Sequence, residues 1–285
     1  MSGNIRIIPR LDIKGPNLVK GIHLEGLRVL GKPERFAKYY YENGADELLY
    51  MDVVASLYGR NSLLDMIQKT SKEVFIPLTV GGGLRSLDDI RVVLEAGADK
   101  VAINTAAIKR PELIREASRK FGSSTIVVSI EAIKKTNDFY EAYTDNGRER
   151  TGVDVLEWAF RVSELGAGEI LITSIDREGT GAGFDFELTR RVAESVPIPV
   201  ITCGGAGTVD HIFEAFKKGR ADAVCVGSLL HYHFIKQFEL EDDFTREGNI
   251  EFLRKRCNFS RIQDTTISEI KKYLDSHGIE CRNQI

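Results

Sequence analysis

A glycine-containing pattern that occurs twice in this chain limits what the chain can fold into. Residues 76–104 read IPLTVGGGLRSLDDIRVVLEAGADKVAIN, and residues 198–227 read IPVITCGGAGTVDHIFEAFKKGRADAVCVG. Each copy predicts a strand, a glycine-rich turn, a helix and a second strand, which together make a βαβ unit. Glycines at the carboxyl end of a strand let backbone N–H groups approach an anion closely, because they carry no Cβ. The repeat predicts two equivalent phosphate-binding turns; the alternative is that the glycines only make tight turns.

The rest of the chain follows the same alternation of strand and helix signals. GADELLY at 44–50 resembles GAGEILI at 166–172, and AGAD at 96–99 resembles GRAD at 219–222. Parallel strands in two sets of four predict an α/β fold that closes as a (βα)8 TIM barrel built from two similar (βα)4 halves. We therefore expect a single barrel domain over residues 1–285, a normal length for this fold. A doubly wound open sheet is the alternative, although it does not predict two equivalent turns.

Three segments interrupt this alternation. Residues 14–32 predict a long polar loop with several glycines, and long loops inside compact domains are usually functional. Residues 134–150 contain the turn signal Asp-Asn-Gly and predict a small hairpin insertion. Residues 234–265 predict an extended segment before the last helix.

Charge and apolar content exclude several classes of protein. The net charge is −3 and no basic block is present, so nucleic acid is not an expected partner. No apolar stretch reaches the ~18 residues of a membrane span, and the first residues lack a signal-peptide core. Cys203, Cys225, Cys257 and Cys281 lack CxxC spacing, which indicates reduced thiols in a cytoplasmic protein. The five histidines show no ligand spacing, so we expect neither a metal nor another cofactor.

Two carboxylates occupy equivalent places in the two halves. Asp12 lies near the end of the first strand and Glu131 near the end of the fifth, so we expect them to face each other across the barrel mouth. A facing pair suits general acid and general base roles, whereas the alternative is a structural pair in polar layers of the barrel. Active sites of this fold lie at the carboxyl ends of the strands. The further candidates there are Asp52, Gly82, Gly83, Asn104, Thr105, Asp176, Gly204, Gly205, Gly227 and Ser228.

Motifs over most of the chain resemble one known family. RIIPRLDIK, GADELLYMD, TVGGG, GADKVAINTAA, GAGEILITSIDREGTGAGFD and CGGAG occur in the order found in the HisF family, the cyclase subunits of imidazole glycerol phosphate synthase. The resemblance implies that ammonia from a glutaminase partner passes along the barrel axis and reacts with a bisphosphate substrate. It implies that Gly83, Asn104 and Thr105 hold one phosphate, that Gly179, Gly204, Gly205, Gly227 and Ser228 hold the other, and that Lys20 lies on a mobile first loop. Arg6, Glu47, Lys100 and Glu169 match the family's charged ring at the barrel bottom, where ammonia enters.

Three features depart from the family pattern. The family's second catalytic carboxylate is an aspartate, whereas this chain has Glu131, and the family has a cysteine where this chain has Arg10. A guanidinium beside Asp12 adds a fixed positive charge and can bind a carboxylate or phosphate through two hydrogen bonds. The 234–265 segment is also longer than the family's link to the last helix.

An intact ammonia entrance with a changed reaction chamber resembles the branch of HisF-like proteins that serve acetamidino-sugar synthesis in surface glycans. That branch implies a HisH-like glutaminase at the barrel bottom, a sugar amidotransferase as a further partner, and a small phosphorylated or anionic substrate bound through Arg10. Two alternatives remain: a genuine cyclase of histidine biosynthesis, and a non-catalytic ammonia conduit that activates its glutaminase.

Overall fold

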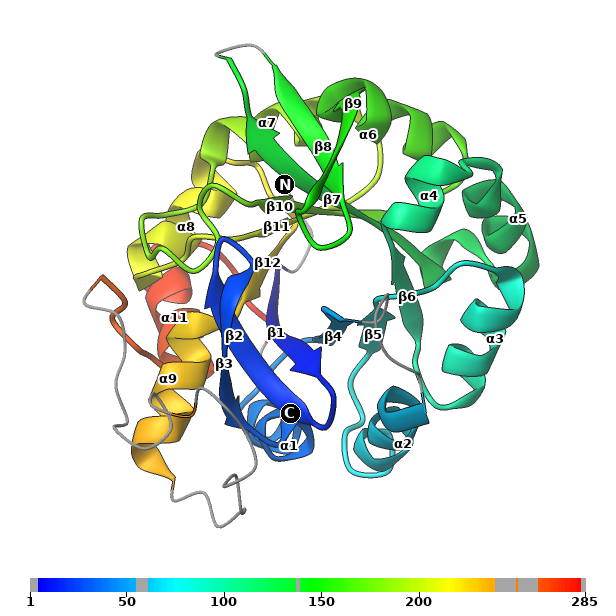
Figure 1. The fold of residues 1–285 in the computed structure, drawn as a ribbon. Coiled ribbons are helices and arrows are strands. Elements are labelled where there is room, and N and C mark those ends of the chain that lie inside the picture. Colours follow the sequence, from blue (N-terminus) through cyan, green and yellow to red (C-terminus); the bar gives the residue numbers. More distant parts are fainter. Residues whose placement is uncertain (1–4, 55–60, 137–138, 239–249, 251–260, 283–285) are drawn as a thin grey trace.

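The chain folds as a closed parallel barrel in the computed structural model, which describes residues 5–54, 61–136, 139–238, 250 and 261–282. Within these residues, eight parallel strands pair in a complete circle (Figure 1). In order around the barrel they are β1 (Arg6–Lys14), β4 (Leu48–Asp52), β5 (Leu78–Gly81), β6 (Lys100–Ile103), β7 (Ile126–Lys134), β10 (Glu169–Ser174), β11 (Val200–Cys203) and β12 (Ala223–Val226). Because β12 pairs with β1, the TIM barrel is confirmed and the open-sheet alternative is wrong.

Helices surround the barrel. They are α1 (Pro33–Glu42), α2 (Asn61–Thr70), α3 (Leu87–Glu95), α4 (Thr105–Lys109), α5 (Glu112–Phe121), η1 (Ser123–Thr125), α6 (Val155–Glu164), α7 (Phe186–Ser195), α8 (Val209–Lys217), α9 (Ser228–Gln237) and α11 (Ile267–Ser276). No helix in the described part of the chain is long and apolar enough to cross a bilayer.

The two halves resemble each other in detail where each glycine turn meets its helix. Ser86 caps α3, its hydroxyl accepting a hydrogen bond of 3.2 Å from the Asp89 N–H. Thr208 caps α8 in the same way, with a 3.4 Å bond from the His211 N–H. A side-chain cap satisfies an N–H group that would otherwise have no partner in the helix. Each glycine turn therefore leads into a helix whose start is fixed by its own sequence.

Alternation along the strands separates an outer core from an inner one. On β1, Ile7 and Leu11 belong to the large apolar cluster between the barrel and the helices. Ile8, between them, belongs to a smaller cluster that includes Leu49, Val127, Leu171, Ile201 and Ala223. Successive side chains of a strand point to opposite faces, so this second cluster lines the barrel interior.

The stretch at 14–32 is not the irregular loop that its sequence predicts. It forms β2 (Asn17–Ile22), which pairs antiparallel with β1, and β3 (Glu25–Gly31), which pairs with β2. The turn between them holds His23 and Leu24 at φ of 52° and 62°. Tight hairpin turns of this kind usually contain Asn-Gly or Asp-Gly, and a His-Leu pair gives no such signal.

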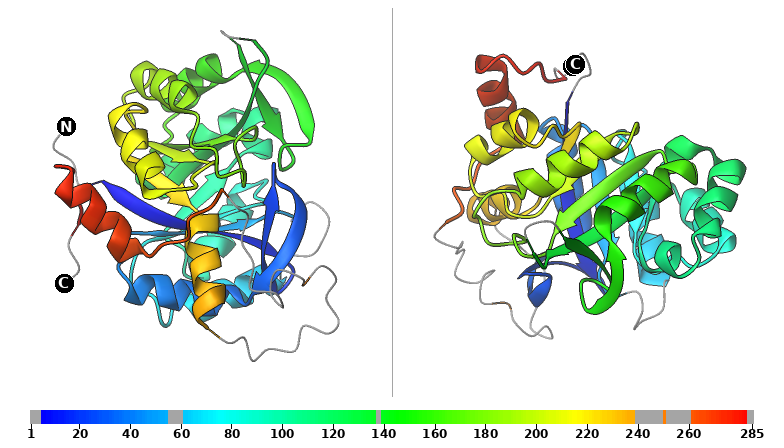
Figure 2. Two further views of the ribbon diagram at one scale, coloured as in Figure 1. Left: turned by 90° about the vertical axis from the view of Figure 1, so that its left-hand side faces the viewer. Right: turned by 90° about the horizontal axis from the view of Figure 1, so that it is seen from above.

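A second antiparallel hairpin lies within the 134–150 insertion and beyond it. β8 (Tyr140–Thr144) pairs with the end of β7, and β9 (Glu149–Asp154) pairs with β8. Figure 2 places the β2–β3 hairpin (blue) and the β8–β9 hairpin (green) at one end of the barrel, with α11 (red) toward the other. Most of the expected extended segment, residues 239–249 and 251–260, lies outside the described residues.

Candidate functional site

Two cavities open at the carboxyl ends of the strands, one in each half of the barrel mouth. These halves of the mouth are not the (βα)4 halves of the chain, because each cavity takes residues from both. The first has a volume of about 590 Å³ and is lined by Asp52, Gly82, Gly83, Asn104, Thr105 and Glu131, together with residues that include Ser129, Arg85, Lys109, Arg110, Asp145 and Asn146. The second has a volume of only about 20 Å³ and is lined by Arg10, Asp12, Lys20, Glu178, Gly179, Cys203, Gly204, Gly205, Ala206, Cys225, Gly227 and Ser228. The candidates named for the two phosphates therefore separate into these two places, in the groups that the sequence suggests.

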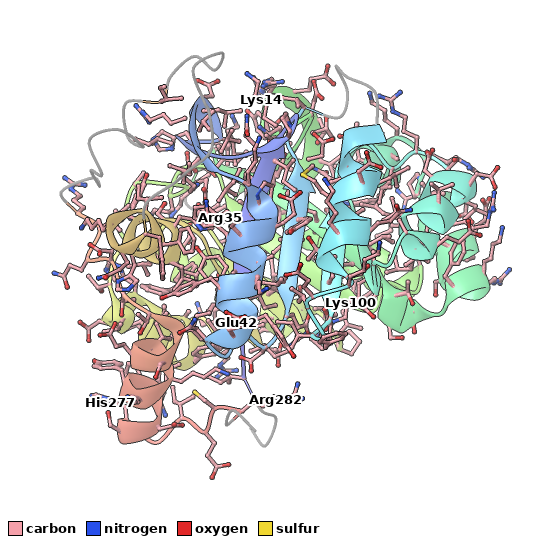
Figure 3. All side chains as sticks on the ribbon, turned by 90° about the horizontal axis from the view of Figure 1, so that it is seen from below. Lys14, Arg35, Glu42, Lys100, His277 and Arg282 are labelled. Carbon is pink, nitrogen blue, oxygen red and sulfur yellow. The ribbon has the colours of Figure 1, made fainter. Side chains whose placement is uncertain are left out.

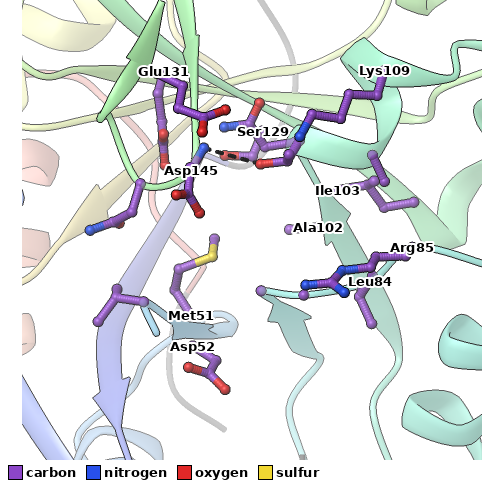
Figure 4. A pocket seen from close by; sticks show the side chains of 18 of the residues that line it. Met51, Asp52, Leu84, Arg85, Ala102, Ile103, Lys109, Ser129, Glu131 and Asp145 are labelled. Atoms are coloured by element: carbon purple, nitrogen blue, oxygen red, sulfur yellow. Dashed lines mark hydrogen bonds between the residues drawn. The ribbon is translucent and has the colours of Figure 1, made fainter. Parts of the chain in front are cut away.

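The first cavity is built on the glycine turn that follows β5. Gly82 has a φ of 104°, and a Cβ added there would lie 2.3 Å from the carbonyl oxygen of Asp52. Only glycine fits this position without moving the backbone. Figure 4 shows Arg85 and Lys109 on one side of the cavity and Glu131 and Asp145 on the other. The cavity thus offers positive charge on one side and carboxyl groups on the other, and Asp52 lies against the glycine turn itself.

Strand β8 and the turn that follows it hold three of the candidate residues in the first cavity. The Asp145 N–H donates to the Thr105 hydroxyl (3.1 Å), and the Asn104 amide donates to the Tyr143 carbonyl (3.2 Å). The Gly147 N–H donates to a carboxyl oxygen of Glu131 (2.7 Å). This turn therefore positions both the expected phosphate site and the expected catalytic carboxyl.

Glu131 is buried, with 5% of its surface exposed. The pKa of this carboxyl is raised to about 7, chiefly by burial and also by the negative charges of Asp12 and Asp145. Arg10 and the Gly147 N–H act in the opposite direction and lower the pKa, but by less. A carboxyl group with a pKa near neutrality can both donate and accept a proton at physiological pH.

The second cavity is enclosed by glycine backbone. Gly204 and Gly205 have φ values of 93° and 111°, and added Cβ atoms would lie 2.7 Å from the Ser174 carbonyl oxygen and 2.2 Å from that of Gly183. Gly179 has a φ of 73°, and a Cβ there would lie 2.4 Å from the Gly21 carbonyl oxygen. The glycines of this half therefore allow backbone segments to approach each other in a way that no other residue permits.

Arg10 extends from β1 into the barrel interior beside this second cavity. Its Nε donates to Asp12 (2.8 Å), and its Nη1 donates to the Thr173 hydroxyl (3.3 Å) and the Cys203 sulfur (3.4 Å). Its Nη2 is buried and has no hydrogen-bond partner among the described residues. Burial lowers the pKa of Arg10, but the attractions of Asp12, Cys203 and Glu178 exceed this effect and hold the pKa well above its ordinary value. The guanidinium is thus a fixed charge with one donor free for another group.

Asp12 and Glu131 line different cavities. Asp12 lies with Arg10 in the closed half, whereas Glu131 lies in the open half and is bonded to the β8–β9 turn. A ligand in contact with both carboxyl groups would have to extend from one half of the mouth to the other.

Asp176 departs from the expected arrangement. One of its carboxyl oxygens accepts a hydrogen bond from the Lys134 N–H (2.8 Å), and it lines a separate surface cavity with residues of α7. Lys20 also differs from expectation, since it is buried within β2 and paired with Glu178. The structure therefore separates Asp176 from the other candidates. It also adds a new candidate, Glu178, which lies two positions after Asp176 in the chain and which the sequence did not single out.

Four charged side chains meet at the opposite end of the barrel. Arg6 Nη1 contacts Glu47 (2.8 Å) and Glu169 (2.7 Å). Lys100 Nζ contacts the same two carboxylates, at 3.0 and 3.2 Å. Figure 3 shows Lys100 well below Lys14, the last residue of β1, toward the other end of the barrel. The four residues named for the ammonia entrance therefore form a closed ring of alternating charge at the amino-terminal ends of their strands.

Comparison of the sequence with known proteins places this chain in a family. The profile of the family described as "Histidine biosynthesis protein" matches residues 6–236. A Methanocaldococcus jannaschii protein, "Imidazole glycerol phosphate synthase subunit HisF", is 46% identical over 97% of this chain and 98% of its own length. The chain belongs to the HisF family.

Two further HisF family proteins show the range of similarity. The Legionella pneumophila HisF subunit is 59% identical over 73% of this chain and 98% of its own length. The Trichormus variabilis HisF subunit is 48% identical over 83% of this chain and 93% of its own length. All three relatives have the same description, "Imidazole glycerol phosphate synthase subunit HisF". They support the histidine-pathway alternative better than the acetamidino-sugar branch, which receives no support from them.

Proposed function

We propose that this chain is the synthase subunit of an imidazole glycerol phosphate synthase. It receives ammonia from a HisH-like glutaminase at the barrel bottom and adds it to a bisphosphate substrate at the mouth. The substrate loses water and is cleaved, which gives imidazole glycerol phosphate, with the new imidazole ring, and an aminoimidazole carboxamide ribotide. The arrangement that best supports this proposal is a single barrel with a charged ring at one end and two glycine turns at the other.

The barrel interior suits the transfer of ammonia between these two ends. Ile8, Leu171 and Ile201 belong to the apolar cluster above the ring. Transfer of a charged ammonium ion into such an interior is costly, whereas neutral ammonia carries no such penalty. The ring of Arg6, Glu47, Lys100 and Glu169 would admit ammonia and exclude bulk water.

The two carboxyl groups would then share the proton transfers of ring closure. Glu131, with its pKa near 7, would donate a proton to a leaving oxygen, and Asp12 would accept one from the attacking nitrogen. Gly82, Gly83, Asn104, Thr105 and Asp52 would hold one phosphorylated end of the substrate. Gly179, Gly204, Gly205, Gly227 and Ser228, with Lys20, would hold the other.

The test is turnover of the histidine-pathway bisphosphate by the purified chain with ammonium salts, together with complementation of a histidine auxotroph lacking this subunit. Turnover that disappears in an Asp12→Asn variant would support the proposal. A chain that folds, stimulates its glutaminase and yet turns over none of this substrate would refute it.

A second candidate function rests on Arg10. Its guanidinium lies beside Asp12 where the family has a small cysteine, and the cavity around it is nearly filled. A different anionic substrate, as in acetamidino-sugar synthesis with a sugar amidotransferase, or a conduit role without cyclisation, would account for such a residue. An Arg10→Cys, Glu131→Asp double variant that gains histidine-pathway turnover, starting from an inactive parent, would favour this candidate.

A further inference from the structure

The closed half of the mouth is filled by the protein's own charges. Arg10, Asp12, Lys20 and Glu178 all line the second cavity, and each has at most 6% of its surface exposed. Their two positive and two negative charges cancel, and about 20 Å³ of free volume remains. That volume is about enough for one water molecule and far too small for a phosphate group. Among the described residues, the open half has no such obstruction, with about 590 Å³ available.

Glu178 occupies the place where an anion would meet the glycine turn. Its Oε1 accepts a hydrogen bond from the Lys20 ammonium group. Its Oε2 lies 3.3 Å from the point where a Cβ of Gly204 would stand, so the carboxylate lies against the turn. Glycine turns of this kind bind anions because their backbone can approach closely. The carboxylate of Glu178 thus makes the contacts with Lys20 and with this turn that a substrate phosphate would make.

The backbone on both sides keeps this carboxylate in place. The Glu178 N–H donates to the Ser174 carbonyl at the end of β10 (3.0 Å), and the Glu178 carbonyl accepts from the His23 N–H in the β2–β3 turn (2.9 Å). The same residue therefore connects the β10 side of the mouth to the hairpin that carries Lys20.

The positive groups around Glu178 would suit an incoming anion. Burial lowers the pKa of Lys20, but the attraction of Glu178, helped by Asp12, exceeds this effect and raises it. Arg10 has one buried donor, Nη2, without a partner among the residues that the structure describes. An anion entering while Glu178 remains in place would meet a negative charge in a desolvated site, where like charges repel strongly.

We propose that Glu178 is a specificity-determining residue of the second phosphate site. Its carboxylate keeps the site closed until a phosphate displaces it. The Lys20 ammonium group then donates its hydrogen bond to the phosphate instead of to Glu178, and Nη2 of Arg10 becomes an additional donor to the phosphate. This inference rests on the proposed function, which assigns a phosphate to each half. A ligand with two phosphates then binds first in the open half, because only that half has room for it.

Inorganic phosphate, titrated into the full chain by calorimetry, tests the inference without catalysis. Wild-type protein should bind phosphate in the open half only. Glu178→Gln keeps the side-chain shape and an oxygen for Lys20 but removes the negative charge, so it should show a second site with at least a tenfold gain in affinity. Glu178→Asp keeps the charge and should show no such gain.

Three controls assign the second site. Gly204→Ala or Arg10→Met, added to Glu178→Gln, should each remove the gained site. Glu187→Gln removes an exposed glutamate that pairs with Arg190 and should leave phosphate binding unchanged. Circular dichroism and the thermal midpoint verify that each variant is folded.

The outcomes separate this inference from the function on which it rests. If Glu178 only holds Lys20 in place, Glu178→Gln will bind phosphate no better than wild type, or more weakly, and the inference is wrong while the open-half site remains. If neither protein binds phosphate in either half, the proposed function and the inference both fail.

Discussion

The protonation of Glu131 should make the stability of this barrel depend on pH in a defined way. Burial raises the pKa of this carboxyl from 4.5 to about 7. At about 1.4 kcal/mol per pKa unit, the difference corresponds to about 3 kcal/mol. Because the pKa is higher in the folded state, the stabilising contribution is fully present below about pH 4.5 and is lost as the pH rises through about 7.

Replacement of Glu131 by glutamine removes this titration and keeps an oxygen that can accept from the Gly147 N–H. The free energy of unfolding of the wild type, minus that of Glu131→Gln, should therefore fall by about 2 to 3 kcal/mol between pH 5 and pH 8. Urea unfolding at intervals of half a pH unit, monitored by circular dichroism, measures both curves. Taking the difference cancels the other titrating groups.

The matched control is Glu187→Gln, which removes an exposed glutamate. Its difference from wild type should show no change of this size over the same pH range, because solvent screens the exposed charge. If the Glu131→Gln difference is equally flat, Glu131 is ionised in the folded protein at pH 5. Its role as a neutral proton donor would then be refuted.

Three further perturbations test other parts of the molecule. Gly204→Ala places a Cβ 2.7 Å from the Ser174 carbonyl oxygen at a φ of 93°, so we expect a loss of about 1 to 3 kcal/mol in urea unfolding; an unchanged stability would contradict the close approach. Arg6→Met leaves two carboxylates of the ring without this partner. Glutamine-dependent turnover should then fall at least tenfold more than ammonium-dependent turnover, whereas equal losses would show that the ring does not control the entry of ammonia. His231 is buried and bonds the Arg10 carbonyl (2.9 Å), and burial lowers its pKa from 6.5 to about 3. His231→Phe should cost about 1 to 3 kcal/mol in the same unfolding assay above about pH 7. Because between pH 6.5 and 3 the imidazole is protonated only in the unfolded chain, this cost should shrink by about 2 kcal/mol by about pH 5, and a cost that stays constant through about pH 6.5 would show that the ring titrates in the folded protein.

The sequence was sufficient to predict the barrel and the end at which its site lies. Glycines after two strands, and carboxylates near the ends of two others, can be placed from strand periodicity alone, because parallel strands bring their carboxyl ends to one edge. The charged ring and its use as an ammonia entrance came from family resemblance, and the structure shows its four side chains in contact at the opposite ends of their strands.

Side-chain partners across long sequence separations could not be predicted. The contact of Lys20 with Glu178 joins residues 158 positions apart, and nothing in either local sequence signals it. The turn at His23 and Leu24 adopts left-handed conformations that are uncommon for any residue except glycine, and most of all for a leucine. The position of the Glu131 carboxyl depends on the Gly147 N–H, a contact set by the β8–β9 turn and not by strand alternation.

The difference in free volume between the two halves has a consequence for the orientation of a ligand. Two similar halves would be expected to accept a molecule with a phosphate at each end in either direction. In this barrel one half is open and the other is occupied by Glu178 and Arg10. The order in which the two ends bind would then select one direction, so a duplicated, nearly symmetric barrel could still position an asymmetric molecule in a single way.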